Sequence, residues 1–255
     1  MTRRRWIADE STDDTAALVG EQANHLARVL RARVGQEFEI AADGRVRLGK
    51  VAAISPERVE FDLGEEIDSG TLPSVHLLLS IFKFDRMEWA IEKATELGAS
   101  AITPVLAQRS ERNLCAAADK RVERWRRIVR EAAQQSRRAT PPEILAPIKL
   151  SEAVNVEAAV RIVLAPEGYP LLSVLQKSGK TSGASADPEG TPLLPAAGRS
   201  GDAALAIGPE GGWTDTELQL FHHAGWSFAS LGPTILRTET AAIAALTTIT
   251  QILAQ

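Results

Sequence analysis

The chain contains little cysteine and histidine, and this scarcity narrows the chemistry it can perform. Cys115 is the single cysteine among 255 residues, which excludes a disulfide within the chain and argues against a cysteine-based metal site. The four histidines show no spacing typical of zinc ligands. We therefore expect no metal centre. These histidines are His25, His76, His222 and His223.

Long apolar runs and the common nucleotide fingerprints are also missing. No run approaches the roughly 18–20 apolar residues of a membrane span. The charged start MTRRRWIADE has no signal-peptide core, so we expect a cytoplasmic location. Neither GxGxxG opening a βαβ unit nor GxxxxGK followed by Ser or Thr is present, which argues against a conventional Rossmann or P-loop site.

The overall charge of −4 is not that of a typical nucleic-acid-binding protein, but its distribution is uneven. Residues 120–138 contain eight basic and two acidic side chains, a local charge of +6. One interpretation is a helix whose arginines face RNA. The other is a solvated helix face with Glu123–Arg127 and Arg127–Glu131 pairs at i,i+4 spacing.

Residues 1–70 are predicted to form a small β-rich domain resembling a partial barrel. Asp43–Gly44 is a strong hairpin signal between two strands, and Gly20–Leu30 has apolar residues at helical spacing. Asp68–Ser74 contains Ser, Gly and Pro, so we place a linker at 71–74. The predicted strands are Arg5–Ala8, Phe38–Ala41, Val46–Ile54 and Arg58–Leu63.

Residues 75–255 are predicted to form a second domain with a mostly parallel sheet. Val75–Ile81 is a nearly continuous apolar run, as expected of a strand buried on both faces. The helix Arg86–Leu97, closed by Gly98, and the strand Ala101–Leu106 complete a βαβ unit. Further on we expect a long helix over Ala118–Arg137, a strand over Val160–Leu164 that ends in APEG, and a flexible loop without chemistry over Gln176–Asp202.

Two glycine-bearing loops dominate the last part of the chain. The strand Ala203–Ile207 leads into GPEGG, and Thr214 with Glu217 forms a capping box for a helix over Asp215–Ala224 that ends at Gly225. The strand Trp226–Leu231 leads into Gly232–Pro233, and Thr238 is the expected N-cap of the last helix. Open α/β sheets bind ligands at such strand ends.

Each loop alone is most simply a turn. The pairing of the two, with Glu210, Arg237 and Glu239 in or beside them, favours a ligand site.

Several segments together resemble the 16S ribosomal RNA uracil-N3 methyltransferases of the SPOUT class. The resemblance runs through almost the whole chain and leaves out mainly Gln176–Asp202. The combination of GPEGG with ILRTETA is specific. The segments are Asn24–Leu26, Arg28–Arg31, Arg86–Trp89, Lys93–Gly98, Gly208–Gly212, Leu231–Gly232 and Ile235–Ala241.

This resemblance implies an α/β protein with a PUA-like β-barrel domain that binds RNA, followed by a trefoil-knotted SPOUT domain. It also implies S-adenosylmethionine as the cofactor, a homodimer with each cofactor site close to the partner subunit, and one uridine of 16S RNA in the assembled small subunit as the substrate. No metal is implied.

The resemblance also assigns roles to particular residues. Arg237 would steady uracil carbonyl charge or a phosphate. Glu239 is the second catalytic candidate: capping of the helix start is its simpler interpretation, and the other is removal of the proton from uracil N3. The candidates for cofactor binding are Ala165, Pro166, Glu167, Ile207, Gly208, Pro209, Glu210, Gly211, Gly212, Leu231, Gly232, Ile235, Leu236 and Thr240. The candidates for RNA binding are His25, Arg28, Arg31, Arg33, Lys83, Arg86, Arg109, Arg112, Arg124, Arg127 and Arg138, each of which is otherwise a solvated surface charge.

Two positions depart from the family pattern: Thr234 replaces an arginine, and Gln134 replaces a glutamate. Two other functions stay open. A SPOUT enzyme could methylate a ribose 2′-hydroxyl or a transfer RNA base, and a non-enzymatic ribosome-assembly factor could use the same loops only as turns.

Overall fold

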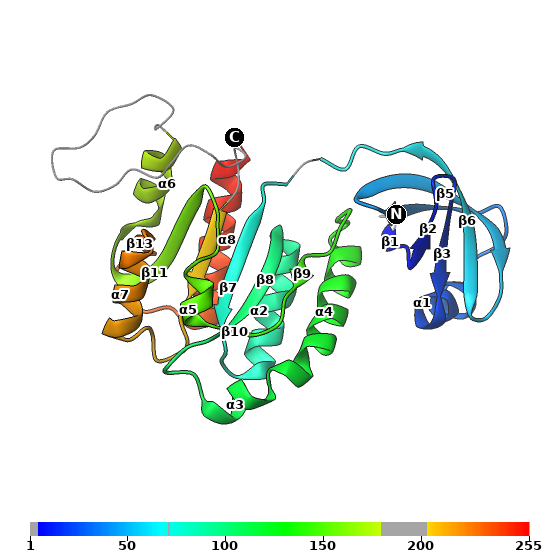
Figure 1. Ribbon diagram of the computed structural model, residues 1–255. Helices are drawn as coiled ribbons and strands as arrows, with labels where there is room; N and C mark the ends of the chain where they lie inside the picture. The colour runs from blue at the N-terminus through cyan, green and yellow to red at the C-terminus, as the bar shows by residue number, and fades with distance from the viewer. Residues whose placement is uncertain (1–4, 71, 180–202, 255) are drawn as a thin grey trace. The chain divides into compact units, whose positions relative to one another are not determined.

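The structure is a computed structural model that describes residues 5–70, 72–179 and 203–254 (Figure 1). Contacts divide it into two compact units. The first unit runs to residue 71 and includes Arg130–Pro141, and the second comprises Leu72–Val129 and Pro142–Gln255. The predicted boundaries at residues 70 and 75 stay a prediction. Residue 71 of the predicted linker and residues 180–202 of the predicted loop lie outside the described ranges.

The first unit is built on a six-stranded sheet with the order β1-β4-β5-β6-β3-β2. The β1–β4 pair is parallel, and the other pairs are antiparallel. The four predicted strands are confirmed, but β2 and β3 were missed because both are short and β3 has no alternating pattern. The strands are β1 Arg5–Ile7, β2 Glu10–Ser11, β3 Thr15–Val19, β4 Glu37–Ala42, β5 Arg45–Ile54 and β6 Arg58–Glu66.

Local sequence signals in this unit agree with its backbone. Asp43 and Gly44 both have positive φ angles, 51° and 77°, as the predicted tight hairpin between β4 and β5 requires. The predicted helical segment begins as α1 (Gly20–Asn24) and continues as a π-helix, η1 (His25–Val29). Leu26 of η1 is fully buried, and it packs in a core with Trp6, Leu18 and Phe61.

The second unit contains a seven-stranded sheet in which every pairing is parallel. Its order is β10-β8-β7-β12-β11-β13, with β9 paired to β8. The strands are β7 Val75–Ser80, β8 Ala99–Leu106, β9 Glu143–Ile144, β10 Ile148–Lys149, β11 Val160–Pro170, β12 Ala203–Ile207 and β13 Ser227–Ser230. The helices are α2 Phe84–Glu96, α3 Arg112–Ala117, α4 Val122–Gln135, α5 Leu150–Ala153, α6 Leu171–Gly179, α7 Asp215–His223 and α8 Thr238–Leu253.

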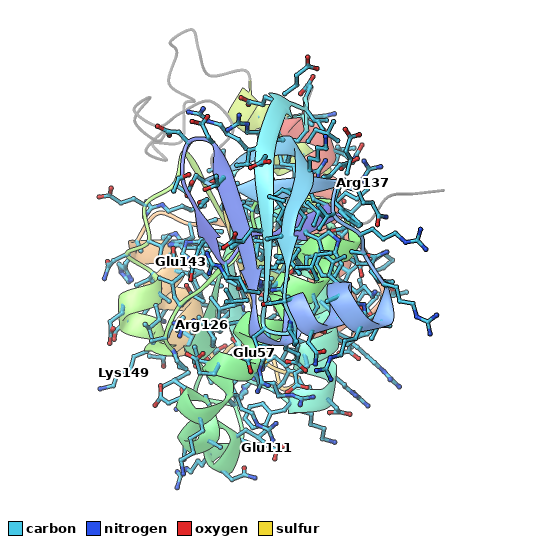
Figure 2. All side chains as sticks on the ribbon, turned by 90° about the vertical axis from the view of Figure 1, so that its right-hand side faces the viewer. Glu57, Glu111, Arg126, Arg137, Glu143 and Lys149 are labelled. Carbon is cyan, nitrogen blue, oxygen red and sulfur yellow. The ribbon has the colours of Figure 1, made fainter. Side chains whose placement is uncertain are left out.

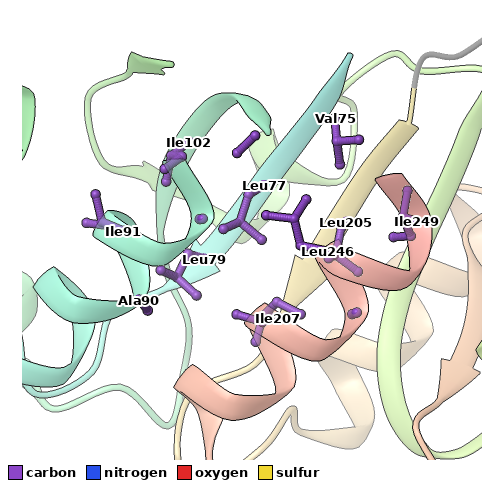
Figure 3. Packing of buried hydrophobic residues seen from close by; sticks show 14 of the residues in the cluster. Val75, Leu77, Leu79, Ala90, Ile91, Ile102, Leu205, Ile207, Leu246 and Ile249 are labelled. Carbon is purple, nitrogen blue, oxygen red and sulfur yellow. The ribbon is translucent and has the colours of Figure 1, made fainter. Parts of the chain in front are cut away.

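Both faces of this sheet are covered, as the continuous apolar strands predict. On one face, Leu77 and Leu79 of β7 join a cluster with residues of α2 and α8. Figure 3 shows Leu246 and Ile249 of α8 beside Leu205 and Ile207 of β12. On the other face, Leu78 packs in a cluster with side chains that precede, form and follow α7, including Trp213, Phe221 and Trp226. None of the helices in the described ranges combines the length and apolarity of a membrane span.

Several boundaries differ from the sequence prediction. The single helix predicted over 118–137 is instead a 3-10 turn at Asp119–Arg121 followed by α4, and the separate helix α3 ends just before this range at Ala117. The predicted loop at 176–202 begins too early, because residues 176–179 belong to α6. The strand predicted to end at Leu164 continues to Pro170 after a register shift between Leu164 and Tyr169. The N-cap of α8 is Arg237 and not Thr238, one position earlier than its hydroxyl suggested.

Candidate functional site

The candidate site lies where three neighbouring strands end: β11 with its irregular last part, and β12 and β13, each of which leads into a glycine loop. β11 lies between β12 and β13, and all three run in the same direction. The GPEGG loop (208–212) leaves β12, and the second loop (231–237) leaves β13. The carboxyl ends of β11, β12 and β13 therefore meet at one edge of the sheet, where open parallel sheets bind ligands.

Trp213 anchors the GPEGG loop. Its indole Nε1 donates a hydrogen bond to the carbonyl of Leu164 at 3.2 Å, and its ring packs edge-on against Phe221 with 4.9 Å between centroids. A Cβ on Gly208 would lie 3.2 Å from this indole, so the ring can approach the chain closely only at a glycine. The loop is thus tied to β11 on one side and to α7 on the other.

The predicted capping box of α7 is present, and its glutamate also holds the segment that follows β8. Thr214 accepts a hydrogen bond from the Glu217 backbone, and the Glu217 side chain accepts from the Thr214 backbone. The other carboxylate oxygen of Glu217 accepts the backbone N–H of Gln108 at 2.7 Å. This explains why Glu217 is buried although it is charged: both of its oxygens have donors.

Arg109 and Arg86 contact the GPEGG loop from different elements. Arg109 follows β8, and its Nη1 donates to the carbonyls of Gly211 at 2.8 Å and Trp213 at 3.1 Å. Arg86 lies in the first turn of α2, and its Nη1 is 3.2 Å from Glu210 Oε1 and 3.9 Å from Glu239 Oε1.

Glu239 is the least expected feature of the site. It lies in the first turn of α8 and is only 6% exposed. No side-chain capping bond is present at this helix start, so the capping interpretation has no hydrogen bond to support it. Its Oε2 is buried without a hydrogen-bond partner among the described residues. An unsatisfied buried acceptor of this kind is rare and calls for a donor from a ligand or water.

The second loop is open to solvent. Gly232 has φ +117°, a conformation that non-glycine residues rarely adopt, and its Cα faces empty space. Ile235 is 99% exposed. Leu231 and Leu236 are half-buried, whereas Arg237 and Thr240 are exposed. Such an apolar, uncovered loop beside a buried acceptor is suited to receive a ligand.

Gly168 allows β11 to approach β13 closely at the site, a role that the sequence did not indicate. A Cβ at Gly168 would lie 2.5 Å from the backbone of Ala229 in β13. The preceding cofactor candidates lie within β11: Ala165 is buried, and Pro166 and Glu167 are exposed. Of the candidates after β12, Ile207 and Pro209 are buried, Gly208 and Gly212 are half-buried, and Glu210 and Gly211 are exposed.

The basic segment 120–138 forms ion pairs that its sequence spacing did not predict. Five of its eight basic side chains pair with carboxylates, and most of the partners come from other elements. Figure 2 labels Arg126 and Arg137 among the charged side chains. The pairs are Arg121 and Arg124 with Glu88, Arg126 with Glu123, Arg130 with Asp9, and Arg137 with Glu39.

The remaining RNA candidates of this segment have different surroundings. Arg127 is exposed, and the described residues provide neither of its predicted i,i+4 ion pairs. Arg138 is half-buried, and burial lowers the pKa of its guanidinium to about 10, so it stays charged at neutral pH. Near the sheet edge, Lys83 and Arg112 are exposed.

The RNA candidates of the first unit lie around η1. His25 is half-buried, with its ring 5.9 Å from that of Trp6. Arg28, Arg31 and Arg33 are exposed. Arg28 also lines a groove of about 560 Å³ with Val19, Gly20, Glu21, Asn24, Pro56 and Glu57.

Known proteins share both units of this chain. An RNA methyltransferase domain profile matches residues 70–250, and an RNA methyltransferase PUA domain profile matches residues 18–64. The ribosomal RNA small subunit methyltransferase E of Synechocystis sp. is 34% identical over 99% of this chain and 78% of its own length. That of Bacillus subtilis is 32% identical over 92% and 89%.

The chain belongs to the ribosomal RNA small subunit methyltransferase E family. Solved structures agree. The Neisseria gonorrhoeae enzyme bound to S-adenosyl methionine has a TM-score of 0.74 and 28% identity, covering 96% of this chain and 95% of that one. A putative methyltransferase from Legionella pneumophila with bound SAM has a TM-score of 0.76 and 26% identity, covering 98% and 97%. The predicted membership of a small-subunit ribosomal RNA methyltransferase family, the RNA methyltransferase activity, and the PUA-like and SPOUT domains are confirmed.

The residues of this methyltransferase E site fit S-adenosylmethionine. Open backbone at Gly212 and Gly232 leaves room for close approach of a ligand, and exposed Ile235 offers apolar surface to an adenine ring. The unsatisfied oxygen of Glu239 is an acceptor for a ligand N–H. Among the described residues no group of three or more His, Cys, Asp or Glu is arranged to hold a metal ion.

Proposed function

We propose that this protein methylates N3 of one uridine in 16S ribosomal RNA, in the assembled small subunit, with S-adenosylmethionine as the donor. The observation that carries the proposal is the meeting of two glycine loops beside a buried carboxylate with an unsatisfied oxygen. The names and bound cofactors of the relatives support it. So does the specific combination of GPEGG with ILRTETA.

The glycine loops and the β11 segment would hold the cofactor mainly through backbone groups. Bound S-adenosylmethionine supplies an electrophilic methyl group, so the chain has to position the reacting atoms and stabilise the attacking N3 anion. The proposed binding residues are Ala165, Pro166, Glu167, Ile207, Gly208, Pro209, Glu210, Gly211, Gly212, Leu231, Gly232, Ile235, Leu236 and Thr240.

Arg237 and Glu239 are the proposed catalytic side chains. Uracil N3 carries a proton that must leave, and Glu239 Oε2 is an acceptor that no protein donor occupies in the described chain. Proton acceptance therefore suits Glu239 better than capping. Arg237 is exposed at the start of α8, where its charge can steady the uracil carbonyls.

The two units have distinct proposed roles in RNA binding. The second unit has to receive the target base in an unstacked state. In the first unit, the exposed side chains of Arg28, Arg31 and Arg33 contact phosphates of the RNA. Of the remaining candidates, Lys83, Arg112 and Arg127 are exposed, and their side chains have neither an ion pair nor a hydrogen bond among the described residues. We also propose a cytoplasmic location, because the proposed substrate is a ribosomal subunit.

We also infer a homodimer and a trefoil knot. Ile235 is an apolar side chain that the described part of the chain leaves 99% exposed, and a second copy near the cofactor would bury it. The strand order supports the knot. β12 inserts between β7 and β11, and the chain then passes to β13 before returning to α8, which packs on β12 and β7.

The reaction can be tested by incubating the protein with labelled S-adenosylmethionine and small ribosomal subunits that lack base methylation. Label is expected on uracil N3 of a single uridine. Label on a ribose oxygen, or on no nucleotide, would contradict the proposal. Naked 16S RNA serves as the comparison for assembled subunits.

The role of Arg237 can be separated from cofactor binding. Arg237→Ala should lower kcat by about 10²–10³, the effect of removing one charge-stabilising donor, and leave the Kd for S-adenosylmethionine largely unchanged. An equal loss of turnover and cofactor affinity would instead make Arg237 a cofactor-binding residue.

A further inference from the structure

Arg86 and Arg109 differ from the exposed candidates Lys83 and Arg112, because their guanidinium groups already bind the protein itself. Both lie on elements that border the site, and by sequence both are candidate phosphate contacts. In the structure each donates to the GPEGG loop: Arg86 to a side chain, and Arg109 to two carbonyls.

Arg109 controls the backbone of the loop. One guanidinium nitrogen bridges the carbonyls of Gly211 and Trp213, which lie on either side of Gly212. Gly212 has φ +68°, a left-handed backbone conformation that favours glycine, and it lies within this bridge. A Cβ on Gly211 would lie 3.3 Å from Arg109 Cβ, so the glycine at 211 lets the arginine lie against the loop. These two hydrogen bonds therefore stabilise the loop conformation in which both carbonyls point to Arg109.

Arg86 joins the GPEGG loop to the start of α8. Its Nη1 faces Glu210 at 3.2 Å and Glu239 at 3.9 Å. The side chains of Arg86 and Glu210 are 36% and 39% exposed, so this pair adds little to stability. Glu239 is different, because its side chain is only 8% exposed and a buried carboxylate needs a nearby cation. Arg86 is the guanidinium that both carboxylates share.

We propose that Arg86 and Arg109 are positioning residues that fix the GPEGG loop in its cofactor-binding shape, and that they are not phosphate contacts. The proposal rests on the proposed use of this loop for S-adenosylmethionine. Arg109 holds the carbonyls of the loop, and Arg86 fixes its carboxylate relative to Glu239. Loss of either side chain frees the loop to adopt other conformations, and cofactor binding must then select the competent one.

The test compares Arg86→Gln and Arg109→Gln with Lys83→Gln and Arg112→Gln. The second pair removes exposed cations for which no ion pair is found within the described chain. Calorimetry with S-adenosylmethionine alone should show an increase in Kd of about tenfold for the first pair, the size expected for a lost hydrogen bond from a charged donor. Lys83→Gln and Arg112→Gln should leave this Kd unchanged.

RNA binding provides the opposite readout. The slope of log K against log salt should be unchanged for Arg86→Gln and Arg109→Gln, because no phosphate contact is lost. If a variant at 86 or 109 lowers that slope by about 0.7–0.9, the value for one phosphate contact, and retains full cofactor affinity, the positioning role is overturned.

A conservative variant and a stability measurement exclude a general folding defect. Arg86→Lys keeps a cation between the two carboxylates and should recover most of the cofactor affinity, whereas Arg86→Gln should not. Cooperative unfolding at a similar midpoint is expected for both. If the wild-type protein binds S-adenosylmethionine but places no methyl on uracil N3, the proposed reaction fails, while the ratio of cofactor affinities still decides the roles of Arg86 and Arg109.

Discussion

The GPEGG loop and the second loop, 231–237, both leave parallel strands of the same sheet, but they are held very differently. The first is fastened by Trp213 to β11, by the Thr214–Glu217 capping box to α7, and by Arg109 to the chain after β8. In the second loop Gly232 faces open space, and Ile235 is 99% exposed.

This contrast separates a preformed half of the site from a half that is completed by binding. Contacts within the chain determine the shape of the GPEGG loop before any ligand arrives, which lowers the entropy cost of binding there. The second loop has few such contacts among the described residues, and in the proposed function a cofactor or a second copy of the chain covers its apolar surface. Substitutions in the first loop should therefore change stability, and those in the second should change binding.

The largest effect is expected from Trp213→Ala. Removing a buried tryptophan leaves a cavity between Gly208 and Phe221 and should lower the free energy of unfolding by about 3–5 kcal/mol. Chemical denaturation provides the measurement. Trp213→Phe is the matched control: it keeps a ring against Phe221 but loses the bond to Leu164, which should cost about 1 kcal/mol. A loss below about 1 kcal/mol for alanine would show that the loop is not fastened through this side chain.

Next in size is the difference between Gly212→Ala and Gly232→Ala. Both glycines have positive φ, so alanine is strained by about 1–3 kcal/mol at either site. The fastened loop cannot relax, so Gly212→Ala should lower unfolding free energy. The open loop can relax in the free protein, and Gly232→Ala should instead raise the Kd for S-adenosylmethionine. Chemical unfolding and calorimetry of both variants provide the measurement. The contrast between the loops is wrong if Gly232→Ala lowers the unfolding free energy and Gly212→Ala raises only the Kd.

A smaller loss of stability is expected from Thr214→Ala. Losing the hydroxyl of a capping box should lower the free energy of unfolding by about 1 kcal/mol. Thr214→Ser retains an oxygen that can accept the bond from Glu217 and should behave almost like the wild type. Equal losses for Ala and Ser would show that the methyl group, and not the cap, provides the stability.

The smallest change in stability is expected from Ile235→Ser. Because Ile235 is almost fully exposed, its replacement should change the unfolding free energy by no more than about 0.5 kcal/mol at low protein concentration. Cofactor affinity and self-association, followed by calorimetry and sedimentation, should both weaken. If stability falls and binding does not, Ile235 is covered by its own chain, and the contrast between the two loops disappears.

Local patterns predicted many elements of the fold correctly. The Asp43–Gly44 hairpin, the Thr214–Glu217 capping box and the doubly buried strand β7 each depend on residues close together in sequence. Short strands such as β2 and β3 carry too few residues to establish a period, so their sequence could not predict them. The extension of β11 past Leu164 depends on pairing with β13, more than fifty residues away in the chain.

The sequence by itself determined the residue types at the site, the two strand-to-loop-to-helix units and the resemblance that indicated their chemistry. Only the tertiary structure decided how the charges are used. Arg124 pairs with Glu88, Arg109 binds the carbonyls of Gly211 and Trp213, and Arg86 faces Glu210 and Glu239. The physical reason is that ion pairs and hydrogen bonds act over a few ångströms of space, and distance along the chain does not set that separation.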